Sequence, residues 1–209
     1  MLTAIEAFRQ LKEGNLRFTG SMTGDAELQS QSRRIKLTKA TEPSAIILGC
    51  SDARVPAEIV FDQGLGDLFV IRVAGNIVSP SQVGSVEFAA ERMGTRLVVV
   101  LGHTQCGAIQ ATIEALENPN GVASRNLLSI VDRVRPSVEG LFATDLRNDR
   151  EALSRAAVRA NIRASANHLR HGSRVLEQLI QDDGLVVVGA EYSLDTGVVD
   201  FFDGVPAGA

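Results

Sequence analysis

The stretches AIILG at residues 45–49 and LVVVLG at residues 97–102 contain no polar side chain. Two further runs rich in Val, Leu and Ile occupy residues 68–73 and 185–190. Runs that are apolar throughout, instead of at alternate positions, are typical of parallel strands in a sheet covered on both faces. The segments between the runs have a helical period, which predicts helices over residues 83–93, 106–117, 124–135, 151–169 and 173–182. The sequence therefore predicts an α/β fold in which a mostly parallel central β-sheet is flanked by helices.

The two ends of the chain extend this core. Residues 2–18 carry apolar side chains at helical spacing, and the polar stretch 19–41 that follows has no sustained pattern. Such a helix and segment can form an arm on another subunit, or a helix that covers its own domain. Residues 198–202 follow a turn and predict a C-terminal edge strand in a hairpin. We expect a single domain over residues 1–209, made of an N-terminal helical arm (1–40) and an α/β core (41–209).

The composition limits the classes of partner. The 209 residues include 21 basic and 25 acidic side chains, and the formal net charge of −4 argues against a nucleic-acid scaffold. No apolar run approaches the roughly 20 residues that cross a bilayer, and the first residues do not resemble a signal peptide. The two cysteines favour a cytoplasmic location, where thiols stay reduced. We therefore expect no nucleic-acid partner and no membrane partner.

Residues with metal-binding chemistry follow both quoted strands directly. CSDAR occupies residues 50–54 after the first strand, and HTQCG occupies residues 103–107 after the second. Ligand sites in open α/β sheets lie at the carboxyl ends of strands, so Cys50, His103 and Cys106 are expected to converge. Two thiolates and one imidazole form a soft tetrahedral site for one Zn²⁺ per chain, with the fourth position open. Catalytic zinc sites keep such an open position, and structural sites close it.

Asp52 and Arg54 lie at alternate positions immediately after Cys50. If Arg54 holds Asp52 as a carboxylate, Asp52 accepts a hydrogen bond from the water or hydroxide on the metal and orients this nucleophile. The alternative is an ordinary surface ion pair, worth about 0–1 kcal/mol. The place of Asp52 and Arg54 beside a candidate ligand favours the catalytic interpretation.

Three more segments accompany these motifs, namely FVIR at residues 69–72, AGN at 74–76 and GSVEF at 84–88. Together with CSDARVP from residue 50 and GHTQCG from residue 102, they resemble the β-class carbonic anhydrases over nearly the whole chain. The resemblance implies an enzyme, a lyase that catalyses the reversible hydration of carbon dioxide to bicarbonate and a proton. It further implies a zinc-bound hydroxide oriented by an Asp-Arg dyad, and an assembly into homodimers or homotetramers with an N-terminal arm reaching across to a partner.

The resemblance also assigns individual residues. Cys50, His103 and Cys106 match the zinc ligands of the family, and Asp52 and Arg54 match its catalytic dyad. The backbone amide of Gly107 matches a family contact to bound bicarbonate-like anions. Many plant-like members carry a glutamine nine residues before the first zinc cysteine, where this chain has Thr41. Gln63 is a candidate replacement in substrate binding, and an ordinary loop residue is an equally good interpretation.

Several alternatives stay open at this point. A hydrolase of carbonyl sulfide or carbon disulfide uses the same zinc set on similar linear substrates. A non-catalytic zinc-binding protein would close the site with His168 or His171, and a dithiol redox protein would use Cys50 and Cys106 without need of the histidine. A further hypothesis is that Asp52 leaves Arg54 at low pH and occupies the fourth zinc position.

Overall fold

The computed structural model describes residues 2–21, 30–38, 40–118, 121 and 124–208. Its helices and strands, in chain order, are α1 (Ala4–Thr19), α2 (Gln31–Lys36), β1 (Ala45–Gly49), α3 (Ala57–Val60), β2 (Leu68–Arg72), η2 (Ala74–Asn76), α4 (Pro80–Arg92), β3 (Leu97–His103), α5 (Gly107–Glu117), α6 (Arg125–Phe142), η3 (Asp145–Asn148), α7 (Arg150–His171), α8 (Arg174–Asp182), β4 (Val186–Tyr192) and β5 (Val199–Asp203). Within these ranges no helix combines the length and the apolar character needed to cross a membrane.

The central sheet has the strand order β2-β1-β3-β4-β5 in the described part of the chain. β1 pairs in parallel with β2 and β3, and β3 pairs in parallel with β4. β5 returns antiparallel to β4 at the edge of the sheet. The four apolar runs of the sequence all form strands, and the predicted α/β fold with a C-terminal edge strand is confirmed.

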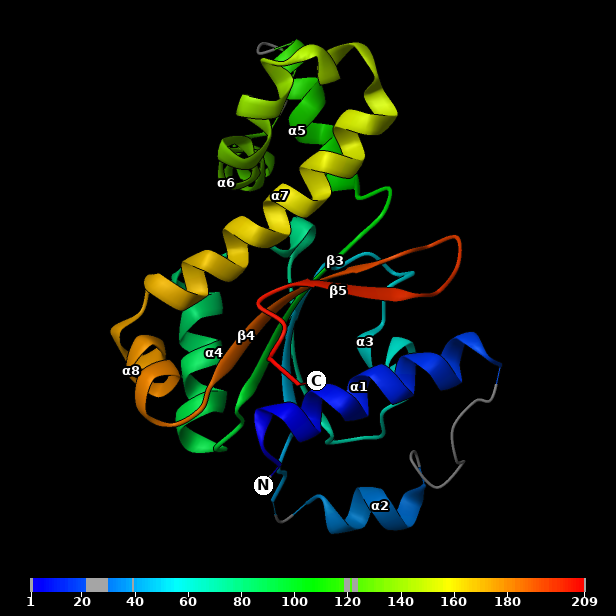
Figure 1. Ribbon diagram of the computed structural model, residues 1–209, viewed down its shortest axis with the longest axis vertical. Coiled ribbons are helices and arrows are strands. Elements are labelled where there is room, and N and C mark those ends of the chain that lie inside the picture. The colour runs from blue at the N-terminus through cyan, green and yellow to red at the C-terminus, as the bar shows by residue number, and fades with distance from the viewer. Residues whose placement is uncertain (1, 22–29, 39, 119–120, 122–123, 209) are drawn as a thin grey trace.

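The two central strands are buried along their whole length because both faces of the sheet are covered. Ile46 and Val98 pack into the cluster to which α4, α7 and α8 contribute, whereas Ile47 and Val99 pack into the cluster of α1 and α3. Figure 1 shows α4 and α8 on one side of the sheet and α1 on the other. The edge strand β2 is only half-buried.

Helix α1 packs on the sheet of its own chain. It begins at a capping box formed by Thr3 and Glu6, and it buries Phe8 among the residues of the sheet. The buried Asn15 side chain donates to the Val60 carbonyl at 3.0 Å and accepts from the Val199 N–H at 2.9 Å. The helix therefore covers its own domain, which is one of the two arrangements open to the sequence. An arm that reaches a partner and ends at residue 40 stays a prediction, and residues 1, 22–29 and 39 of that segment lie outside the described residues.

The predicted end of one helix at residue 135 is wrong, since α6 continues through Pro136 to Phe142. Proline lacks an N–H and so forfeits a helical hydrogen bond. Val134 and Val138, on either side of the proline, are both fully buried. Burial of one such side chain stabilises the fold by about 1.5–3 kcal/mol, which offsets the loss at Pro136.

Candidate metal centre

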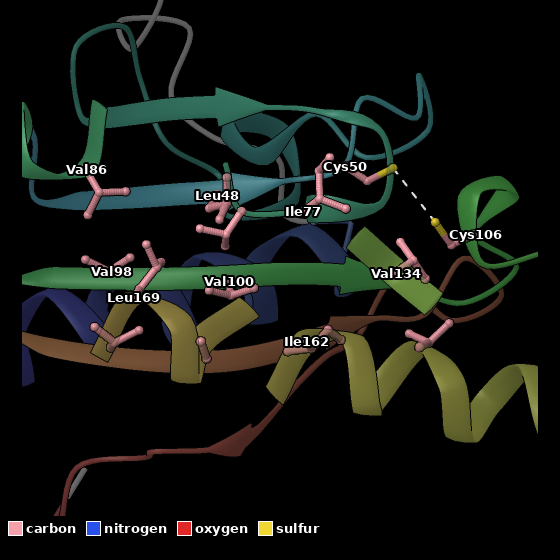
Figure 2. Packing of buried hydrophobic residues seen from close by; sticks show 14 of the residues in the cluster. Leu48, Cys50, Ile77, Val86, Val98, Val100, Cys106, Val134, Ile162 and Leu169 are labelled. Atoms are coloured by element: carbon pink, nitrogen blue, oxygen red, sulfur yellow. Dashed lines mark hydrogen bonds between the residues drawn. The ribbon is translucent and has the colours of Figure 1, made fainter. Parts of the chain in front are cut away.

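Three elements bring the predicted ligands together. Cys50 follows the last residue of β1, His103 is the last residue of β3, and Cys106 precedes the first residue of α5. β1 and β3 are parallel neighbours with Gly49 opposite Leu101, so the residues that follow them lie at the same carboxyl edge. Figure 2 shows the Cys50 and Cys106 side chains facing one another beyond this edge.

The potential ligand atoms form one buried cluster. The two sulfur atoms of Cys50 and Cys106 lie 4.0 Å apart, and both lie with a ring nitrogen of His103 within 4.8 Å of one another. The three residues are 5% exposed or less, and both thiols are free of disulfide bonds. Among the described residues this is the one group of three or more His, Cys, Asp or Glu side chains placed to hold a metal.

The hydrogen bonding of the His103 ring shows whether the cluster fits zinc. Its Nδ1 lies 2.8 Å from the Thr104 carbonyl oxygen, which assigns the ring proton to Nδ1 and leaves the Nε2 lone pair available. The buried Nε2 atom has no hydrogen-bond partner among the described residues, and an unpaired buried polar atom costs about 1–3 kcal/mol. A metal ion removes this cost. Two sulfurs and one imidazole nitrogen are a donor set that zinc prefers, so the residues fit a zinc ion.

Thr104, the residue after His103, is held against β4 and the segment that follows it. The Thr104 N–H donates to the Tyr192 carbonyl at 3.0 Å, and the Thr104 hydroxyl accepts from the Leu194 N–H at 3.0 Å. His103 itself pairs with Tyr192 across β3 and β4. The strand pairing and the hydrogen bonds of Thr104 therefore fix the backbone that carries the imidazole.

The cysteine pKa values shift in opposite directions. The hydrogen bond between the two sulfurs lowers the pKa of Cys50, which accepts it, and raises the pKa of Cys106, which donates it. Burial and the negative charge of Cys50 raise the pKa of Cys106 further. Burial lowers the pKa of His103, but the contacts with Cys50, Thr104 and Asp52 together raise this pKa above its usual value. A dication supplies the charge that lets both sulfurs ionise while the imidazole stays neutral.

Asp52 and Arg54 form a bidentate ion pair beside the cluster. The Arg54 Nε and Nη2 atoms donate to the two carboxylate oxygens at 2.9 and 2.7 Å, and the Arg54 N–H adds a third bond at 3.0 Å. These hydrogen bonds hold the pKa of Asp52 well below its usual range. The Asp52 Oδ2 atom lies 3.9 Å from His103 Nε2. The Asp52 side chain is 18% exposed and the Arg54 side chain 54%, so the carboxylate lies toward the ligands and the guanidinium toward solvent.

Arg72, the last residue of β2, holds the segment between Cys50 and Asp52. Its Nε atom donates to the Cys50 carbonyl at 3.1 Å, and its Nη2 atom donates to the Asp52 carbonyl at 2.6 Å. The register of the sheet makes these bonds reachable, since Arg72 pairs with Gly49 across β1 and β2. Sequence reasoning missed this role, because an arginine at a strand end does not reveal which carbonyls it will meet.

The two predicted substrate-binding residues lie in different surroundings. Gly107 is the first residue of α5, so its N–H has no acceptor within the helix. Gln63 is 6% exposed. Its amide nitrogen donates to the Phe61 carbonyl at 2.8 Å, and its amide oxygen accepts from the Gln10 side chain of α1 at 2.7 Å. The Gln63 amide thus joins α1 to the α3 loop, and substrate binding by Gln63 and Gly107 stays a prediction.

The two other histidines do not approach the cluster. His168 and His171 lie at the C-terminal end of α7 and are exposed. Neither belongs to the group of ligand atoms, and His168 lines a separate surface cavity together with Glu87 and Arg133. The structure therefore does not support a zinc site closed by one of these histidines.

Residue 102, next to His103, has no room for a side chain, and glycine occupies it. A Cβ atom at residue 102 would lie 2.6 Å from Cδ1 and Cγ1 of Ile162, a fully buried residue of α7. We expect Gly102→Ala to lower the free energy of unfolding by about 1–3 kcal/mol, as measured by urea denaturation. The loss should be smaller in an Ile162→Ala background, which opens the space. The matched control is Gly140→Ala, where an added Cβ meets no atom within 4 Å; equal losses at both glycines would refute the steric argument.

Comparisons with known structures define the class of protein. A β-carbonic anhydrase of Aspergillus fumigatus has a TM-score of 0.74 and 24% identity, over 84% of this chain and 82% of that one. A tetrameric β-carbonic anhydrase of Sordaria macrospora has a TM-score of 0.72 and 23% identity, over 81% of this chain and 85% of that one. The arrangement of strands and helices is therefore the β-carbonic anhydrase fold.

The sequence comparisons place the chain within a family. A family model described as carbonic anhydrase matches residues 45–199. Carbonic anhydrase 2 of Mycobacterium tuberculosis is 37% identical over 195 residues, which cover 92% of this chain and 90% of that protein. The chain belongs to the carbonic anhydrase family, in its β class, as the motifs around Cys50 and Cys106 predict.

Proposed function

We propose that this protein catalyses the reversible hydration of carbon dioxide to bicarbonate and a proton, with one Zn²⁺ per chain held by Cys50, His103 and Cys106. The observation that carries the proposal is the buried donor cluster beside a carboxylate fixed by Arg54. In this cluster His103 Nε2 has no hydrogen-bond partner in the part of the chain that the structure describes. Membership of the carbonic anhydrase family supplies the reaction class.

The residues of the site have distinct tasks in this reaction. When bound, zinc lowers the pKa of a water molecule and so supplies a nucleophile at neutral pH. The Asp52 carboxylate accepts a hydrogen bond from this nucleophile and orients it toward carbon dioxide, while Arg54 keeps the carboxylate charged and fixed. The first-turn N–H of Gly107 donates to an oxygen of the product, assisted by the positive end of the α5 dipole. Each turnover consumes one water, forms one bicarbonate and releases one proton to solvent.

A stopped-flow assay of carbon dioxide hydration, with the zinc content measured in parallel, tests the proposal. We expect hydration activity that rises in proportion to the zinc content, up to one equivalent per chain. The same preparation should be assayed with carbonyl sulfide and carbon disulfide. A zinc-loaded protein that hydrolyses either of these and leaves carbon dioxide unhydrated would establish the rival hydrolase. A zinc-loaded protein inactive on all three would establish a non-catalytic role.

We further propose that the protein assembles into homodimers or homotetramers. Phe88 of α4 is 52% exposed, and its ring lies 6.3 Å from that of Phe69 in the half-buried edge strand β2. Aromatic side chains are enriched at protein interfaces, and an edge strand can pair with another chain. Light scattering should give the mass of two or four chains, and a monomer at micromolar concentration would contradict this assembly.

The proposal includes a cytoplasmic location. Cys50 and Cys106 are free thiols 4.0 Å apart, and a reducing compartment keeps such a pair available to a metal. Cell fractionation with detection by antibody tests the location, and recovery in an extracellular or periplasmic fraction would contradict it.

A further inference from the structure

Two buried polar residues of α7 hold the turn η2, which lies beside Cys50. The Asn161 Nδ2 atom donates to the Gly75 carbonyl at 2.8 Å, and the Ser165 hydroxyl donates to the Asn76 carbonyl at 3.0 Å. Asn161 is 2% exposed and Ser165 is 6% exposed. Their spacing of one helical turn puts both side chains on the same face of α7. The helix therefore fixes two successive carbonyls of the turn.

The backbone of this turn is in a conformation that needs support. Gly75 has φ +72° and Asn76 has φ +43°, both in the left-handed region, which costs a non-glycine residue about 1–2 kcal/mol. A Cβ at residue 75 would lie 2.8 Å from the Cβ of Ala108, so the turn also packs against the first turn of α5, which follows Cys106. It is thus enclosed between α7 and the segments that carry the two cysteines.

The turn presents a hydrogen-bond donor to a ligand atom. The Gly75 N–H points at the Cys50 sulfur, with nitrogen and sulfur 3.4 Å apart. A donor of this kind orients the ligand atom and tunes its electron density, and loss of such an outer contact typically weakens metal binding. The Gly75 N–H and carbonyl belong to adjacent peptide planes joined at the Cα atom. Because glycine rotates freely there, loss of the carbonyl anchor lets the N–H turn away from the sulfur.

We propose that Asn161 is a positioning residue of the metal centre, which aims the Gly75 N–H at the Cys50 sulfur by holding the Gly75 carbonyl. The described hydrogen bonds link Asn161 to Cys50 through Gly75, and Asn161 acts on the bound metal through the Cys50 thiolate as a ligand. This inference rests on the proposed function only in that a metal occupies the cluster of Cys50, His103 and Cys106.

Cobalt substitution tests the inference with a spectroscopic signature. Asn161→Leu keeps the approximate size of the side chain and removes the donor. We expect the sulfur-to-cobalt charge-transfer band of the variant to shift, and its affinity for zinc, measured by chelator competition, to fall about tenfold. The matched control is Ser165→Ala, which loses a bond of the same kind from the same helix to the next carbonyl. The control should keep the wild-type spectrum, since the Asn76 N–H donates to the Val73 carbonyl and not to sulfur.

The possible outcomes separate the inference from the proposed function. A wild-type protein that binds neither cobalt nor zinc refutes the metal centre itself. A wild-type spectrum and zinc affinity in Asn161→Leu refute only the positioning role, and so do equal changes in both variants.

If Asn161→Leu does not fold, NMR spectroscopy of the wild-type protein loaded with ¹¹³Cd tests the inference instead. A scalar coupling between the cadmium nucleus and the Gly75 amide proton, transmitted through the sulfur, supports the inference. Absence of this coupling, with the other ligand signals present, overturns it.

Discussion

Cys106→Ser should lose zinc and carbon dioxide hydration together. A serine hydroxyl is a hard, weakly acidic donor and a poor ligand for zinc. In the variant only Cys50 and His103 would remain from a cluster whose atoms lie within 4.8 Å of one another. We expect turnover to fall by a factor on the order of 10³ or more, since the activation of water depends on the metal. Metal analysis of the purified variant and stopped-flow hydration measure the two losses.

A fold control keeps this result interpretable. Both cysteines of the chain lie in the cluster, so no remote Cys→Ser variant exists for comparison. The circular dichroism spectrum of Cys106→Ser should match that of wild type, because Cys106 precedes α5 without a side-chain cap bond to it. One equivalent of zinc with wild-type turnover in this variant would remove Cys106 from the ligand set.

Asp52→Asn should separate metal binding from catalysis. The amide is neutral and cannot keep both bonds from Arg54, so the acceptor facing the nucleophile loses its charge and its fixed orientation. We expect the variant to retain one zinc per chain and to turn over on the order of 10²-fold more slowly. The loss should fall on kcat, because Asp52 is assigned to the nucleophile and not to the capture of carbon dioxide.

Asp62→Asn is a suitable control for the loss of an ion pair. Asp62 accepts from Arg17 at 2.5 Å, and its side chain is 12% exposed, close to the value for Asp52. Its partner lies on α1, which packs on the sheet face away from α4 and α7, and its substitution should leave turnover near that of wild type. Equal turnover in Asp52→Asn and Asp62→Asn would remove Asp52 from the mechanism.

The ligand cluster was predictable from sequence because it depends on neighbouring parallel strands. Cys50 and His103 each follow or end an apolar run, and the carboxyl ends of adjacent strands meet at one edge. The ion pair of Asp52 and Arg54 needed only local information, since the two residues are two positions apart. The same reasoning gave the parallel sheet and the antiparallel β5.

The supporting contacts were not predictable in this way. Asn161 reaches Gly75 across 86 residues of sequence, and its position on α7 resembles that of any polar residue on a helix. The carbonyl contacts of Arg72 depend on the register between β1 and β2, which a pattern of apolar residues does not reveal. The end of α6 was misplaced because tertiary packing of Val134 and Val138 overrides the local effect of Pro136.

The hydrogen bonds that join Thr104 with Tyr192 and Leu194 involve protein atoms alone. The segment around His103 is therefore held in place by the protein alone, unlike the ligand loops of small zinc domains, which fold only around their metal. Removal of the metal by a chelator and its later return should be reversible, and the chain should stay folded throughout. With the proposed zinc site, metal supply would govern how many molecules are active at a given moment, independently of how many are folded.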